Sequence, residues 1–108
     1  MQQGKVYRNN VFVGFISRKK ILGYTFQYDE DYLNSDNPKA ISINLKLRRE
    51  PYESIFLFSF FANLLAEGDI KELQCKQLRI DKNDNFSRLL KTTKNNTIGS
   101  ITIEEVIK

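Results

Sequence analysis

Side chains that commonly carry out chemistry are few in this sequence. Its 108 residues include no histidine and a single cysteine, Cys75. Histidine is the commonest general base and metal ligand in proteins, so a zinc site or a histidine-based catalytic site is excluded. Cys75 stands beside Lys76 in a segment expected to be helical, where a buried structural thiol is expected in preference to a reactive one.

The acidic side chains offer one candidate group, the run of Asp29, Glu30 and Asp31. A catalytic carboxylate pair needs a pocket that raises one pKa, whereas this run stands in a polar, turn-rich stretch that predicts a solvated loop. The phosphate-binding patterns GxxxxGK and GxGxxG are absent, and no serine stands in a nucleophile elbow. We therefore expect that the chain is not an enzyme on its own and uses no cofactor or metal.

Basic residues outnumber acidic ones, 17 to 13, which gives a net charge of +4. Two short clusters, Arg18-Lys19-Lys20 and Arg48-Arg49, could contact phosphate groups. Acidic residues are interspersed, so the clusters also fit solvated turns, and a basic nucleic-acid-binding module stays an alternative. The lone cysteine, the lack of a signal peptide, and an apolar run (55–66) too short to span a bilayer together predict a cytoplasmic protein.

Five segments are predicted as strands from their alternating apolar residues: 5–7, 11–16, 21–28, 40–48 and 98–106. Asn9-Asn10 favours the positive φ of a tight hairpin turn between the first two. In the second strand, Val11, Val13 and Phe15 are expected to share one face. In the third, Tyr24, Phe26 and Tyr28 are expected to share one face, and in the last, Ile101 and Ile103 are expected to point inward.

The strictest alternation is in segment 40–48, and it predicts an antiparallel strand with one buried and one wet face. Its buried face would carry Ile41, Ile43, Leu45 and Leu47. We expect these residues to face the same core as the helix that follows.

The most apolar stretch is 55–70, IFLFSFFANLLAEGDI. One helical face, at i, i+3, i+4, i+7 and i+8, consists of Leu57, Phe60, Phe61, Leu64 and Leu65. Ser54 is expected to cap the helix, and Gly68 to end it in a left-handed conformation. Because so little of its surface is polar, we expect the helix to be buried on most sides, by the rest of this domain or by a partner.

Two further helices are predicted. The first starts at the capping box formed by Asp69 and Glu72 and would bury Ile70, Leu73 and Leu78. The second, capped by Asp84 or Asn85, would bury Phe86, Leu89 and Leu90. The order of elements predicts one α+β domain over residues 1–108, an antiparallel sheet of about five strands with about three helices packed on one side.

The pattern of a known family is carried by four stretches: VYRNNVFVGFIS, YTFQYDEDYLNS, AISINLKL and FFANLLAEGDIKE. They resemble the N-terminal subdomain of HipA-type serine/threonine kinases, and most closely its free-standing version, the HipS-type antitoxins of tripartite HipBST systems. The last stretch is similar to the family's F-F-x-N-L-L-P-E-G, with Ala66 in place of the proline. IGSITI is a weaker fifth match, and together the stretches cover about residues 5–103 in the family's order.

The resemblance implies an antitoxin that binds and inhibits a separate HipA/HipT-like serine/threonine kinase toxin, docking near the active-site cleft of the kinase. In the family, the ATP, magnesium and catalytic aspartate sites lie in the larger kinase part, so none is carried over to this chain. The family context also implies a HipB-like DNA-binding protein as a candidate third member of the complex. No direct contact with nucleic acid or a membrane is expected in this interpretation.

The inhibitory contact is predicted at the end of the apolar helix, at Asn63, Ala66, Glu67, Gly68, Asp69 and Ile70. Excess apolar surface marks interfaces, and short corners between rigid elements commonly carry binding function. Because Asp69 is expected to cap the next helix, Glu67 and Ile70 are the stronger candidates for direct contact. The same corner also fits a plain helix–helix turn with no further role.

Overall fold

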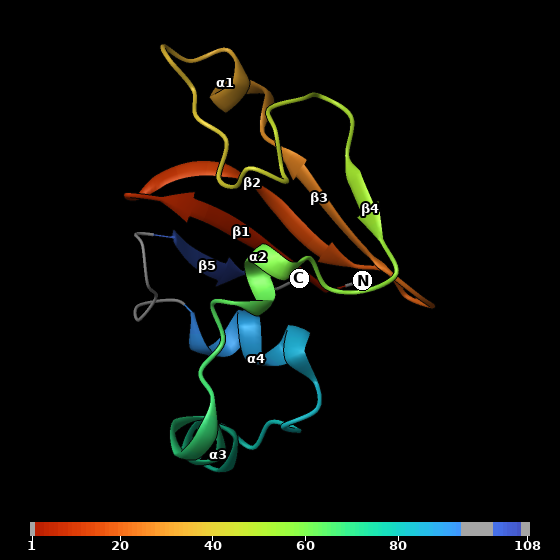
Figure 1. Ribbon diagram of the computed structural model, residues 1–108, viewed down its shortest axis with the longest axis vertical. Coiled ribbons are helices and arrows are strands. Elements are labelled where there is room, and N and C mark those ends of the chain that lie inside the picture. The colour runs from red at the N-terminus through yellow and green to blue at the C-terminus, as the bar shows by residue number, and fades with distance from the viewer. Residues whose placement is uncertain (1, 94–100, 107–108) are drawn as a thin grey trace.

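The computed structural model describes residues 2–93 and 101–106, which form an antiparallel sheet with helices (Figure 1). The strands are β1 (Gln2–Arg8), β2 (Val11–Arg18), β3 (Tyr24–Tyr28), β4 (Tyr52–Ser54) and β5 (Ile101–Glu105). The helices are α1 (Glu30–Leu33), α2 (Ser59–Ala62), α3 (Gly68–Leu78) and α4 (Asn85–Thr92). The sheet order is β4-β3-β2-β1-β5, and α2, α3 and α4 lie on one side of it. The predicted α+β class is confirmed.

The hairpin of β1 and β2 turns at Asn9 and Asn10, whose φ angles of 50° and 68° confirm the predicted turn. Val13 is an extra residue in β2, because Val6 pairs with Gly14 while Tyr7 pairs with Phe12. Such a bulge shifts the alternation of side chains by one residue. Val13 and Ile16 are therefore both buried in the core. The prediction that Val13 shares a face with Phe15 is wrong for this reason.

β3 begins at Tyr24, three residues later than the strand predicted from Ile21. The Lys19 N–H donates to the Gly23 carbonyl (2.9 Å) and closes a loop in which Ile21 and Leu22 are 97% and 65% exposed. The prediction that Tyr24, Phe26 and Tyr28 share one face is confirmed, and the structure turns that face toward the core.

Segment 40–48 is not a strand, contrary to the prediction. The hydroxyl of Tyr28, in β3, donates to the Leu45 carbonyl and holds the segment as a loop over the end of the sheet. The Leu45 N–H donates to the Ser42 carbonyl (3.1 Å) and closes a turn. Within this turn Ile43 points to solvent and is 87% exposed, whereas Leu45 is 2% exposed. The place beside β3 is taken by β4, so alternation alone does not produce a strand here. Two other apolar residues are partly buried against the core, Ile41 and Leu47.

The stretch 55–70 does not form the long helix predicted from its periodicity. Only α2, a single turn, is helical before α3, and it starts after Phe58 without a side-chain cap, so the expected cap at Ser54 is wrong. Ile55 and Phe56 follow β4 outside any helix and are 61% and 78% exposed. The apolar residues of this stretch therefore lie in several short segments and not in one helix.

α2 packs against both the sheet and α4. Phe61 is fully buried, and its ring lies 5.5 Å from that of Phe26 on β3. Leu65 is also buried, and α2 contacts α4 beside it. α4 covers the same side of the sheet, so α2 and α4 share the core (Figure 1). The remaining apolar side chains of the predicted face are partly buried: Leu57, Phe60 and Leu64.

The main helix on the sheet is α4, as the sequence predicts. Asp84 caps it, accepting a hydrogen bond from the Ser87 N–H at 3.1 Å. Its buried side chains are Phe86, Leu89 and Leu90. A Cβ at Gly4 of β1 would lie 2.7 Å from Leu90, so the close approach of α4 to the sheet requires glycine there.

The last predicted strand is confirmed as β5, which pairs antiparallel with β1. Ile101 and Ile103 face the core, as predicted. Residues 98–100 of the predicted strand, which are the first half of the IGSITI match, lie outside the described residues.

Candidate functional site

The predicted contact residues lie together at a corner between α2 and α3. Asn63 ends α2, and Gly68 is the first residue of α3. The exposed members of the predicted set are Asn63, Glu67, Gly68, Asp69 and Ile70, and Ala66 is half-buried. We call residues 63–70 the α2–α3 corner.

Gly68 gives the corner its shape. Its φ of +63° is left-handed, as predicted, although the residue starts α3 and does not end the helix before it. A Cβ at this position would meet no atom within 4 Å. Glycine is therefore needed for the backbone conformation and not for space within the chain, and the backbone at the corner is open to an approaching molecule.

A buried arginine fixes the corner to α4. Arg88 is 2% exposed and donates hydrogen bonds to the Ala66 carbonyl (2.6 Å) and to the Asn85 side-chain oxygen (3.0 Å). Hydrogen bonds from a charged donor are stronger than those between neutral groups, so this contact anchors the chain just before α3. Sequence reasoning missed Arg88. The only signal was a charged residue inside the apolar α4 pattern, and nothing in the sequence links it to Ala66.

The predicted capping box at the start of α3 is absent. The N-cap position is Glu67, which makes no side-chain cap, and Asp69 lies inside the first turn. There its carboxylate still interacts favourably with the positive end of the helix dipole. Glu72, the other member of the predicted box, forms an ion pair with Lys82 at 3.5 Å. Asp69 is exposed, so its carboxylate is available to a partner together with Glu67 and Ile70.

α3 presents its apolar residues to solvent, contrary to the prediction that they are buried. Ile70, Leu73 and Leu78 are 62%, 56% and 49% exposed, and the buried residue of the helix is Cys75. The main packing partner of α3 is α4, and α3 lies on the far side of α4 from the sheet (Figure 1). Ile70 belongs both to the α2–α3 corner and to the exposed apolar face of α3, so the two surfaces are continuous.

The carboxylate run at 29–31, which was predicted to be a solvated loop, forms the start of a short helix. Asp29 caps α1 and accepts a hydrogen bond from the Tyr32 N–H at 3.3 Å, while Glu30 and Asp31 are exposed in the first turn. Cys75 is buried at 6% exposure. In the described part of the chain, no group of three acidic, cysteine or histidine side chains is placed to hold a metal ion.

Both basic clusters are partly engaged within the chain. Arg18 pairs with Asp84 at 2.8 Å, and Lys19 pairs with Glu53. The Arg48 guanidinium lies 3.6 Å from the centre of the Tyr52 ring. These contacts lower the number of cations that are free to bind phosphate groups.

Comparison with known proteins identifies the fold. The chain is similar to a solved structure titled "N-terminal domain of HipA toxin", with a TM-score of 0.72 and 24% sequence identity, over 100% of this chain and 95% of that one. The sequence pattern of the HipA N-terminal domain family matches residues 4–104, and the chain therefore belongs to that family. This membership fits a component of a toxin–antitoxin system.

A second comparison is with a protein of Haemophilus influenzae described as "Uncharacterized protein". It is 31% identical over 105 residues, which is 97% of this chain and 93% of that protein.

In residues 2–93 and 101–106, no helix has the length and apolar character that a membrane span requires.

Proposed function

We propose that this chain is a HipS-type antitoxin, which binds and inhibits a separate HipA/HipT-like serine/threonine kinase toxin. The observation that carries the proposal is the span of the family match, residues 4–104, which assigns nearly the whole chain to the domain found at the N-terminus of HipA. The kinase part of HipA is outside this match. The proposed partner is a kinase that lacks this domain, and this chain would bind it as a separate protein.

The α2–α3 corner is the proposed inhibitory contact, docking near the active-site cleft of the kinase. Its residues are Asn63, Ala66, Glu67, Gly68, Asp69 and Ile70. Three features support this placement. The Arg88 hydrogen bond anchors the corner, the backbone at Gly68 is unobstructed, and Ile70 joins the corner to the exposed apolar face of α3. Exposed apolar side chains next to a rigid turn are typical of protein interfaces.

The proposed complex is cytoplasmic and has a HipB-like DNA-binding protein as a third component. The chain itself is not proposed to bind nucleic acid, because Arg18, Lys19 and Arg48 already have partners within the chain. It is not proposed to be an enzyme, because the family match covers the N-terminal domain and not the kinase.

The proposal is tested by titrating this chain into its candidate partner, a purified HipA/HipT-like kinase that lacks this domain, using calorimetry and a kinase assay. The wild-type chain is expected to bind and to suppress kinase activity. Changing Glu67→Ala and Ile70→Ala together is expected to weaken binding by about 2 kcal/mol or more, roughly thirtyfold. Both side chains are exposed, so circular dichroism should show an unchanged fold.

A matched control is the pair Glu50→Ala and Ile43→Ala. These side chains are also exposed, but they stand in the loop before β4 and belong neither to the α2–α3 corner nor to α3. Wild-type affinity is expected for this control. If the corner variant keeps wild-type affinity, the interface lies elsewhere on the chain. If the wild-type chain does not bind the kinase, the antitoxin proposal is wrong.

A further inference from the structure

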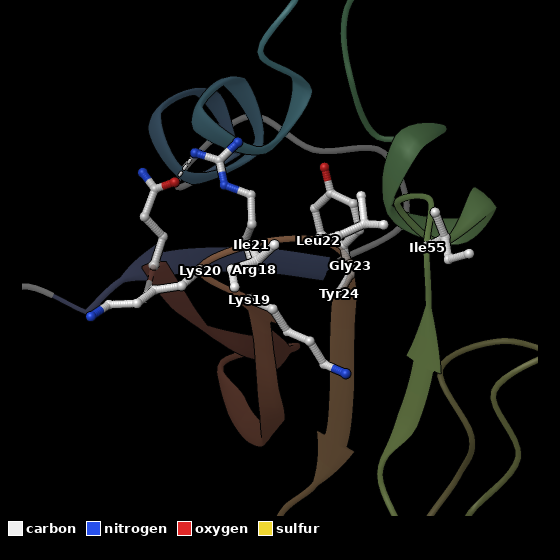
Figure 2. A pocket seen from close by; sticks show the side chains of 9 residues that line it. Arg18, Lys19, Lys20, Ile21, Leu22, Gly23, Tyr24 and Ile55 are labelled. Carbon is white, nitrogen blue, oxygen red and sulfur yellow. Dashed lines mark hydrogen bonds between the residues drawn. The ribbon is translucent and has the colours of Figure 1, made fainter.

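A second group of exposed apolar side chains surrounds a recess at the tip of the β2–β3 hairpin (Figure 2). The recess has a volume of about 480 Å³, and it shares no residue with the α2–α3 corner. Ile21 and Leu22 line it from the loop after β2, and Ile55 lines it from the chain after β4. These three side chains are 97%, 65% and 61% exposed. The volume is within the range of about 300–1,000 Å³ that is typical of ligand-binding pockets.

The loop that carries these residues is held in shape. The Lys19 N–H donates to the Gly23 carbonyl at 2.9 Å, and Gly23 has a φ of +108°. A Cβ on Gly23 would lie 3.1 Å from the Ser54 carbonyl oxygen at the end of β4. The loop is therefore fixed against the neighbouring strand, and its conformation directs Ile21 and Leu22 toward solvent. A preorganised apolar surface of this kind loses little conformational freedom on binding.

All the charged side chains that line the recess are basic. Its lining includes Arg18, Lys19 and Lys20 and no carboxylate residue. Arg18 is engaged by Asp84 and by Gln2, and Lys19 is engaged by Glu53. Among residues 2–93 and 101–106, Lys20 has no ion-pair partner, and its side chain points away from that of Lys19 (Figure 2). A positive charge thus remains at the rim, beside the apolar wall.

We infer that this recess binds an acidic, amphipathic segment of a partner protein. An aliphatic or aromatic side chain of the segment would enter between Leu22 and Ile55, and a neighbouring Asp or Glu would pair with Lys20. Charge complementarity at a rim guides association and selects partners, while the apolar contact supplies most of the affinity.

Two other occupants fit the recess less well. A nucleic acid would leave the apolar wall without a partner, since phosphate contacts need the cations alone. A lipid surface is held by a cluster of unpaired basic residues beside the apolar ones, whereas Arg18 and Lys19 are paired with Asp84 and Glu53. The inference does not depend on the proposed antitoxin function, because neither the recess nor its chemistry involves the α2–α3 corner.

The test uses the full-length chain and a random peptide library displayed on phage. Enriched peptides are expected to combine Asp or Glu with a large apolar residue. A selected peptide is then synthesised and titrated by fluorescence anisotropy. The variant with Ile21→Ser and Leu22→Ser is expected to bind it at least about tenfold more weakly, and so is Lys20→Glu. A rise in salt concentration should weaken binding to the wild-type chain but change little for Lys20→Glu.

The matched control is Ile43→Ser, which removes an equally exposed isoleucine (87%) from a loop that does not line the recess. It should bind the peptide as the wild-type chain does. No enrichment of acidic peptides, or equal binding by the Ile21→Ser and Leu22→Ser variant, would overturn the inference. So would sedimentation of the wild-type chain, but not of this variant, with vesicles of phosphatidylglycerol and phosphatidylcholine, since that result assigns the apolar residues to a lipid surface.

Discussion

Asp84 joins two distant parts of the chain through one carboxylate. It accepts hydrogen bonds from the Ser87 N–H (3.1 Å) and hydroxyl (2.8 Å), and it pairs with Arg18 at the end of β2 (2.8 Å). Burial raises the pKa of Asp84, but the hydrogen bonds from Ser87 and Arg18 outweigh it, so the net pKa lies below the ordinary value of 3.8. The carboxylate is therefore stabilised in its charged form in the folded state.

The effect of Asp84 on stability depends on pH in a defined direction. Because its pKa is lowered by folding, its contribution is present above the unfolded-state pKa of 3.8 and is lost as pH falls through the folded-state value. Replacing it, Asp84→Ala, removes a helix cap and is expected to cost about 1 kcal/mol at pH 7. In urea unfolding, the difference from the wild-type chain should shrink at pH values below about 4.

The control for this prediction is Asp84→Asn. Asparagine is also a good N-cap residue, so most of the stability should be kept at neutral pH, while the charge-dependent part is absent. If the loss caused by Asp84→Ala is the same at pH 7 and in acid, the carboxylate charge does not contribute.

At the scale of elements, the edge of the short strand β4 is covered by the loop that precedes it. Arg48 stacks on Tyr52, and its guanidinium donates to the carbonyls of Glu50 and Pro51 at 3.1 and 3.0 Å. The Tyr52 hydroxyl in turn donates to the Lys46 carbonyl at 2.8 Å. Open strand edges invite pairing with other chains, and covering them prevents it. The loop of segment 40–48 and the residues after it thus cover the β4 edge of the sheet without adding another strand.

The loop character of this segment is tested by two substitutions of apolar residues two positions apart. Leu45 is 2% exposed, and Leu45→Ala is expected to cost about 2–5 kcal/mol in chemical denaturation. Ile43 is 87% exposed, so Ile43→Ala should change the free energy of unfolding by no more than about 0.5 kcal/mol. In a strand with one buried face the two losses would be similar, and equal losses would contradict the loop described here.

At the scale of the whole molecule, the described residues have a sheet, a covering layer of α2 and α4, and α3 behind α4 (Figure 1). Two groups of exposed apolar residues lie on the face of α3 and around the recess by Ile21. Other apolar residues, such as Val11 and Ile43, are exposed outside these two groups. Exposed apolar clusters of this kind are typical of chains that bind other proteins. A chain with two such surfaces is suited to contact two partners, or one partner at two points.

The purified chain is expected to have no phosphotransfer activity of its own. It should neither hydrolyse ATP nor transfer phosphate to itself or to a general kinase substrate, with or without magnesium, in a radiolabel assay. Its family match covers the N-terminal domain and not the kinase. Stoichiometric ATP turnover that copurifies with the chain would contradict this expectation.

A mobility shift of duplex DNA in a gel, caused by the isolated chain and lost with added salt, would instead favour the nucleic-acid-binding alternative.

Several elements could be predicted from the sequence because their signals are local. Asn9 and Asn10 accept positive φ with low strain, which determines the first hairpin regardless of its surroundings. Asp84 caps α4, and the spacing of Phe86, Leu89 and Leu90 identifies its buried side. Gly68 marks a left-handed residue, and the exposed corner around it was predicted from that residue and from the apolar stretch before it.

Other features were decided only by competition for the sheet. Periodicity shows which side chains would gain from burial, but not which neighbour is available to bury them. β4, and not the predicted strand 40–48, pairs with β3. α4 covers the sheet together with the single turn of α2, where a long helix over 55–70 was predicted as well. α3 is therefore left behind α4 with Ile70 and Leu73 exposed. Its polar sequence, GDIKELQCKQL, was the one local sign of that exposure.

Long-range contacts account for the rest of the candidate site. The hydrogen bond from Arg88 to Ala66 joins residues 22 positions apart, and the pair of Arg18 and Asp84 joins residues 66 positions apart. The sequence determined that a rigid, exposed corner would follow the apolar stretch. Only the tertiary structure decided how that corner is anchored and which apolar side chains surround it, because those contacts depend on which elements reach the sheet.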